Sequence, residues 1–146
     1  VKELFWCDAR KIDEHGKDDT NVYSNMGGDF ILKLNGHDRF SARDYRYFTR
    51  TQVWQHHSGA GGLTTRFAES EVNGSASLGN FNDSIAVYSF ALKPEEHQPS
   101  GTCNFSRIDN ARLECTTELT YVTKIFAVNY NVLRIMSGMG GLAYSN

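Results

Sequence analysis

The chain has 146 residues, a formal net charge of -2 and an apolar share of 40%. This length corresponds to a single domain with a sizeable core. The nearly neutral charge gives no indication of a nucleic-acid surface, and no apolar run is long enough for a transmembrane helix.

The first part of the chain reads as short strands joined by turn-rich connections. Residues 1–7 predict a strand that ends near Trp6. Residues 8–28 are charged and rich in turn formers, which indicates a long surface loop. Residues 29–34 alternate in polarity, as a half-buried strand does, and Asn35-Gly36 predicts a tight turn. The apolar face of that strand comprises Phe30, Leu32 and Leu34.

The next segment mixes arginines with aromatic residues. Such interleaving over residues 37–48 is compatible with stacking on nucleic-acid bases. The favoured interpretation is that the aromatics fill the core while the arginines pair with Asp38 and Asp44, because these acids cancel the local charge. Residues 51–57 predict an edge strand. Adjacent His56 and His57 would then face opposite sides, which argues against one shared metal ion.

The middle of the chain contains a strand and a rigid corner. Residues 58–83 are rich in Gly, Ser, Ala and Asn and predict a loop. Residues 85–92 predict a strand that Pro94 ends. Beyond a turn at residues 99–101, Asn104 and Ser106 are candidates to cap a short turn. Arg107 and Asp109 follow within pairing distance along the chain.

The last part predicts two further strands. Residues 112–117 alternate as a half-buried strand does, and residues 121–136, apolar on both faces, suit a strand in the middle of a packed barrel. Asn129 and Asn131 interrupt that run and indicate a bulge. A glycine-rich turn at 137–141 leads to an apolar tail, residues 142–144, which could pack on its own barrel or on a neighbour. The three cysteines lack metal-type spacing and indicate reduced thiols, with a Cys103–Cys115 bridge as the alternative.

Several segments of the chain resemble one protein family. They are VKELFW at 1–6, LNGHDRF at 34–40, Gln55-His56-His57, VYSFALKPEEHQPSGTCNFSRIDN at 87–110 and FAVNYNVLRIMSGMGGLAYSN at 126–146. In this order, and over about half of the chain, they resemble the double jelly-roll major capsid proteins of nucleocytoplasmic large DNA viruses, especially the algal-virus and iridovirus-like branches.

The resemblance implies an all-β fold, an antiparallel jelly-roll sandwich or barrel. Residues 1–146 would form a single, incomplete C-terminal domain, the latter part of the second jelly roll, with loop insertions near 8–28 and 58–83. The opening strands of that jelly roll would be missing, so an exposed sheet edge is expected at the N-terminal side. Expressed alone, such a piece is expected to aggregate or to be only marginally stable.

The resemblance also implies a structural function in the virion. The expected partners are copies of the same protein in a homotrimeric capsomer, neighbouring capsomers that tile an icosahedral shell, and minor capsid proteins. Assembly is expected in the host cell, in its cytoplasm. No cofactor and no direct contact with nucleic acid are expected.

Candidate interface residues lie mainly at 93–110, after the 85–92 strand, because rigid exposed loops commonly carry function on β scaffolds. They are Glu95, Glu96, His97, Arg107, Asp109 and, in the apolar tail, Tyr144. The alternative function is a non-catalytic carbohydrate-binding module that uses Trp54, Tyr47 and His56. No catalytic residues are predicted, because the sequence has no Gly-x-Ser-x-Gly, no HExxH and no recognisable carboxylate pair.

Overall fold

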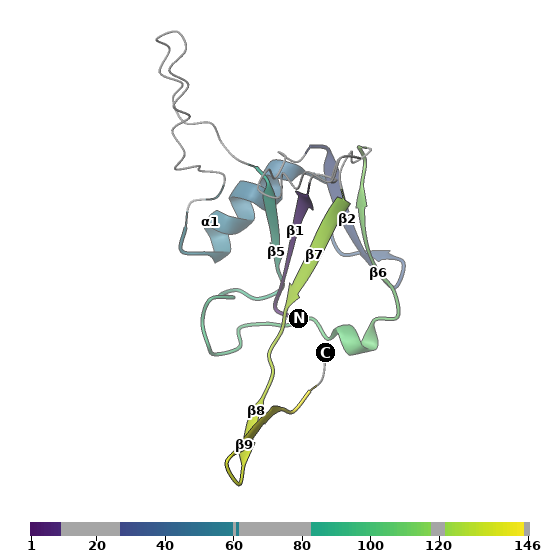
Figure 1. Ribbon diagram of the computed structural model, residues 1–146. Coiled ribbons are helices and arrows are strands. Elements are labelled where there is room, and N and C mark those ends of the chain that lie inside the picture. The colour runs from purple at the N-terminus through teal and green to yellow at the C-terminus, as the bar shows by residue number, and fades with distance from the viewer. Residues whose placement is uncertain (10–26, 60, 62–82, 118–121, 145–146) are drawn as a thin grey trace, which may run out of the picture.

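The computed structural model describes residues 1–9, 27–59, 61, 83–117 and 122–144. These residues form two antiparallel sheets, a short helical segment and a separate hairpin (Figure 1). Most of the two predicted insertions, 8–28 and 58–83, lies outside the described residues. Within the described ranges, no helix is long and apolar enough to cross a membrane.

The first sheet is built around the N-terminal strand. Strand β1 (Glu3–Ala9) lies between β5 (Ile85–Ser89) and β7 (Val122–Val128), and it is antiparallel to both. Trp6 is opposite Ala86 on one side and Ile125 on the other. Strand β1 is therefore not an edge of the sheet, because both of its edges carry a partner, and the outer strands are β5 and β7.

The second sheet is built around β2 (Asp29–Leu34). One edge of β2 pairs with β6 (Ala111–Cys115), and the other pairs with the short strands β3 (His37–Asp38) and β4 (Arg43–Asp44). The Asn35-Gly36 turn is confirmed, since φ is 51° at Asn35 and 80° at Gly36, as a type I′ hairpin requires. The predicted alternation also holds, because Phe30 and Leu32 are buried.

An aromatic cluster forms the core between the two sheets. The Trp6 ring centroid lies 5.6 Å from that of Phe30 and 5.2 Å from that of Phe48. These three side chains are almost fully inaccessible to solvent. Each ring thus contributes apolar burial and an additional ring–ring interaction. Because the cluster joins β1, β2 and the helical segment, it fixes how the two sheets face each other.

Residues 47–56 are helical, so the predicted edge strand at 51–57 is wrong. A π-helix, η1 (Tyr47–Thr51), continues directly into α1 (Gln52–His56). The buried side chains Phe48, Thr49 and Gln52 share one helical face. Gln52 is held there because its Nε2 donates to Tyr47 Oη at 2.9 Å and its Oε1 accepts from Ser89 N at 3.1 Å. Because Thr49 and Gln52 are polar, the helical period of this buried face is not evident in the sequence.

The long apolar run at 121–136 is not one central strand. Strand β7 ends at Val128, and β8 (Leu133–Met136) pairs only with β9 (Met139–Leu142). Asn129 and Asn131 cause the break, because each Oδ1 accepts from the N–H of the following residue, at 2.9 and 2.8 Å. These local bonds replace ladder bonds, so the chain breaks instead of forming the predicted bulge.

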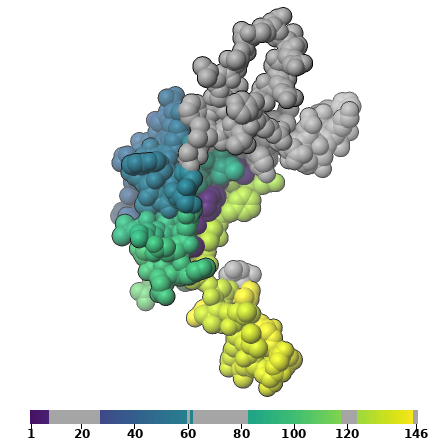
Figure 2. Space-filling model, turned by 90° about the vertical axis from the view of Figure 1, so that its left-hand side faces the viewer, coloured from purple at the N-terminus to yellow at the C-terminus, as the bar shows by residue number. Residues whose placement is uncertain are grey.

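The β8–β9 hairpin projects from the body of the molecule (Figures 1 and 2). Its turn has positive φ at Ser137 and Gly138, at 50° and 78°. Among the described elements, β8 and β9 contact only each other. Among the described residues no disulfide joins Cys103 to Cys115, so the alternative bridge does not form; Cys7 is buried and the other two cysteines are half-buried.

Candidate interaction surfaces

The corner, residues 90–104, is fixed to the start of the chain. The Lys2 carbonyl accepts hydrogen bonds from Phe90 N at 2.9 Å and from Ala91 N at 3.3 Å. Farther along, Cys103 N donates to the Val1 carbonyl at 2.8 Å. Strand β5 therefore ends at Ser89, before the predicted end at Leu92, because the next N–H groups turn towards Lys2. These contacts anchor the two ends of the corner to the start of the chain.

One glycine is essential to the corner. Gly101 has φ of +142°, and a Cβ there would lie 2.8 Å from the Phe90 carbonyl oxygen. Inside the bend, Pro94 is fully buried, and Ser100 Oγ accepts from Lys93 N at 2.8 Å. Local side-chain bonds thus satisfy the backbone where strand pairing has ended.

The predicted interface residues of the corner are all exposed. Glu96 forms an ion pair with Lys93 at 3.1 Å. Glu95 turns towards the end of α1, where its carboxylate accepts from Ser58 N and Oγ at 3.1–3.2 Å. The Ser58 N–H, followed by the Ser58 hydroxyl and His57, lowers the pKa of Glu95. The side chain of His97 is also exposed.

Arg107 and Asp109 are exposed as well, but they do not form a pair. Arg107 ends a 3-10 turn, η2 (Phe105–Arg107), which Asn104 caps by accepting from Ser106 N at 3.1 Å. This confirms the predicted cap at Asn104, whereas Ser106 contributes its backbone N–H. Asp109 N donates to Asn35 Oδ1 at 2.9 Å, which ties the end of the corner region to the β2–β3 turn. Within the described ranges, no ion pair joins Arg107 to Asp109.

Tyr144 lies at the base of the β8–β9 hairpin, apart from the other candidates along the chain. Its side chain is 63% exposed, and its backbone bonds to Asn131 at both N and O. The structure therefore does not gather the predicted interface residues into one site. It distributes them over the corner, η2 and the hairpin base.

Exposed apolar side chains occur on β7 and on the β8–β9 hairpin. Ile125 and Phe126 are adjacent on β7, hence on opposite faces, and their side chains are 54% and 55% exposed. The hairpin adds Leu133, Ile135, Met136, Met139 and Leu142, each more than half exposed. We call β7 together with the hairpin the apolar arm (Figure 2). Single exposed apolar residues are ordinary, but several on one projecting hairpin are typical of an interaction surface.

The arginines among the aromatics mostly cover tyrosine rings. The Arg43 guanidinium lies 4.5 Å from the Tyr47 centroid, and that of Arg46 lies 5.2 Å from the Tyr45 centroid. Arg46 also pairs with Asp44 at 3.5 Å. This arrangement favours the interpretation in which the segment is structural over one in which its rings stack on bases.

Only part of the predicted carbohydrate-binding set, Trp54, Tyr47 and His56, is open to a ligand. Trp54 is 77% exposed, but Arg43 covers Tyr47 and His56 Nδ1 lies 3.1 Å from the Leu92 carbonyl oxygen. In the part of the chain that the structure describes, no group of three or more His, Cys, Asp or Glu side chains could hold a metal ion.

The fold defines the class of protein. Two antiparallel sheets packed around an aromatic core form an all-β, jelly-roll-type domain. A solved structure, PBCV-1 VP54 fitted into a cryo-EM reconstruction of the virophage Sputnik, is similar with a TM-score of 0.68 and 30% identity. The similarity covers 100% of this chain and 43% of that chain. A quasi-atomic model of the PBCV-1 virus capsid is similar with a TM-score of 0.63.

Sequence comparison identifies the family. Residues 78–141 match a model described as large eukaryotic DNA virus major capsid protein. The major capsid protein of Pyramimonas orientalis virus is 49% identical over 100% of this chain, which spans 37% of that protein. That of Paramecium bursaria Chlorella virus 1 is 42% identical over 79% of this chain and 28% of the relative. The chain belongs to the major capsid proteins of large eukaryotic DNA viruses and spans well under half of their length.

Proposed function

We propose that this chain is part of a structural capsid subunit that assembles into an icosahedral viral shell. The subunit forms a homotrimeric capsomer, contacts neighbouring capsomers and minor capsid proteins, and resides in the virion after assembly in the host cytoplasm. It is not an enzyme. Residues 1–146 form the latter part of its second jelly roll. The observation that carries this proposal is the similarity of the whole chain to relatives that are major capsid proteins.

The apolar arm supports a role in assembly. A two-stranded hairpin is marginally stable on its own in water. Here Ile135 is 69% exposed and Met139 is 75% exposed, so the hairpin has apolar side chains without cover from the described elements. Burial of such side chains stabilises an interface by roughly 25 cal/mol per Å² of apolar surface removed from water. The proposed cover is the remainder of the subunit together with neighbouring copies.

The corner supplies a second, polar contact surface. Its backbone is held by Val1 and Lys2, just before β1, and its exposed side chains include Glu95, Glu96 and His97. Arg107 and Asp109 extend this surface at η2 and just beyond it. Rigid loops with exposed charge determine orientation and partner choice more than affinity. In this proposal the apolar arm provides binding energy and the corner provides specificity.

Quantitative mass spectrometry of purified virions tests the function directly. Peptides of this chain should be among the most abundant in the particle, because a shell protein is present in many copies. Their absence from intact particles would overturn the proposal.

Substitutions in the full-length protein test the two surfaces. Ile135→Asp combined with Met139→Asp should weaken trimer formation, whereas the control Trp54→Ser, at a comparably exposed site on α1, should not. Alanine at both Arg107 and Asp109 should impair capsomer assembly. Normal assembly of that double variant would exclude the part of the polar surface at and just beyond η2 as an interface.

A further inference from the structure

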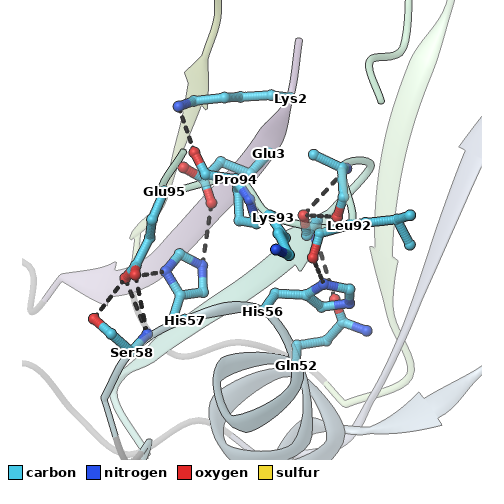
Figure 3. A network of polar contacts seen from close by, with 12 residues as sticks. Lys2, Glu3, Gln52, His56, His57, Ser58, Leu92, Lys93, Pro94 and Glu95 are labelled. Carbon is cyan, nitrogen blue, oxygen red and sulfur yellow. Dashed lines mark hydrogen bonds and ion pairs between the residues drawn. The ribbon is translucent and has the colours of Figure 1, made fainter. Parts of the chain in front are cut away.

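His57 lies between two carboxylates from different parts of the fold. Its Nε2 is 3.1 Å from Glu3 Oε2 on β1, and its Nδ1 is 3.3 Å from Glu95 Oε1 in the corner (Figure 3). The side chains of His57 and Glu3 are 14% and 8% exposed, whereas that of Glu95 is 48% exposed. One imidazole thus joins the end of α1, the first strand and the corner.

A neutral imidazole cannot satisfy both carboxylates. It carries one N–H, so the lone pair of its other nitrogen faces a carboxylate oxygen, whereas the protonated ring donates from both nitrogens. The buried Glu3 Oε2 and His57 Nε2 have no well-aligned hydrogen bond despite their separation of 3.1 Å. A buried carboxylate without a cation is costly. Protonation of His57 supplies that cation and a second donor.

Other charged groups near the site are already engaged. Lys2 Nζ donates to the Pro94 carbonyl, and Lys93 pairs with Glu96. Among the described residues, His57 is the one side chain within ion-pair distance of Glu3, and likewise of Glu95. The uncharged ring of Phe5 also packs against His57, with the two ring centroids 6.0 Å apart.

We propose that Glu3, His57 and Glu95 form a proton-dependent clamp that fastens the corner to β1 and α1. When the His57 ring is protonated on both nitrogens, it binds both carboxylates and the corner is held closed. When the ring is neutral, one of its two contacts becomes repulsive, and the corner opens more often. The clamp therefore acts on the polar contact surface described above, although its existence does not depend on the capsid function.

The test compares variants of the full-length protein at about pH 6 and about pH 8, on either side of the ordinary titration of histidine. The variants are His57→Gln, Glu3→Gln and Glu95→Gln. The matched control is His56→Gln, because the neighbouring His56 contacts a backbone carbonyl and no carboxylate. The readouts are the thermal unfolding midpoint and the rate of limited proteolysis within residues 93–101, each normalised to the control at the same pH.

In the wild type, cleavage of the corner should be about fivefold slower at pH 6 than at pH 8, the factor expected when a neutral hydrogen bond becomes charge-assisted. His57→Gln and Glu95→Gln should abolish that pH dependence, and Glu95→Gln, at a half-exposed site, is the milder change if the others fail to fold. If His57→Gln lowers the unfolding midpoint and speeds cleavage of the corner equally at both pH values, the proposal is overturned, because such a result would indicate a purely structural role. An unchanged pH dependence in Glu95→Gln would overturn it as well.

Discussion

The indole of Trp6 allows ring size and ring polarity to be tested separately in the core. Trp6 is 1% exposed and packs on Phe30 and Phe48, yet its Nε1–H has no hydrogen-bond partner among the residues that the structure describes. Trp6→Ala removes the whole ring and should cost about 3–5 kcal/mol of the free energy of unfolding. Trp6→Phe behaves differently because it also removes the unsatisfied donor.

Two opposing effects act in Trp6→Phe. The lost volume, roughly 40 Å³, costs about 1 kcal/mol at about 24 cal/mol per Å³ of cavity. Removal of a buried, unsatisfied N–H recovers about 1–3 kcal/mol. Trp6→Phe should therefore be neutral or stabilising by up to about 2 kcal/mol, and the aromatic contacts with Phe30 and Phe48 persist.

Thermal unfolding of the full-length protein, followed by calorimetry, measures both variants. A change of 1 kcal/mol shifts the midpoint by about 2–4 °C in a domain of this size. Trp6→Ala should therefore lower it by roughly 6–20 °C, while Trp6→Phe should leave it within a few degrees or raise it. A loss in Trp6→Phe that approaches the loss in Trp6→Ala would refute the reasoning, because it would show that the indole N–H is satisfied or that ring size alone matters.

Three further outcomes are expected. Gly101→Ala should destabilise the protein by about 1–3 kcal/mol in thermal unfolding because of its strained φ, whereas Gly59→Ala, where a Cβ meets nothing within 4 Å, should change little. Hydrogen bonds from Arg50 lower the pKa of Asp83, so its ionised form stabilises the fold at pH values above about 4, and this contribution disappears as pH falls through the lowered pKa. Asp83→Asn should thus destabilise the protein near neutral pH but progressively less in acid; a constant difference would contradict this. Residues 1–146 expressed alone should self-associate through the apolar arm, and a monomer that melts cooperatively, seen by light scattering and calorimetry, would contradict that expectation.

The strands with a clear period of two were predictable from the sequence. Phe30 and Leu32 face the core of β2, and Leu113 and Cys115 do so in β6, because one face of each strand is covered and the other is not. The Asn35-Gly36 turn is specified locally by two residues that tolerate positive φ. The family was predictable for a different reason, since long motifs persist in sequence even where their structural role is not evident.

The helical segment and the apolar arm were not predictable. Gln52 is buried only because Tyr47 and Ser89 satisfy both ends of its amide, which depends on contacts between distant residues. Residues 121–136 are apolar on both faces, as a buried central strand is, but a strand covered by another part of the subunit or by a neighbour has the same composition. The sequence pattern indicates that such side chains need cover and does not identify what covers them. The clamp was missed for a similar reason, because Glu3, His57 and Glu95 are widely separated along the chain and become neighbours only through folding.

The most direct test of the assembly proposal is the mass of the full-length protein in solution, measured by size-exclusion chromatography with light scattering. A capsid subunit of this family should form a stable trimer, and Ile135→Asp with Met139→Asp should shift it towards the monomer. A full-length protein that remains monomeric at every concentration tested would contradict the proposed capsomer and the assignment of the apolar arm to assembly.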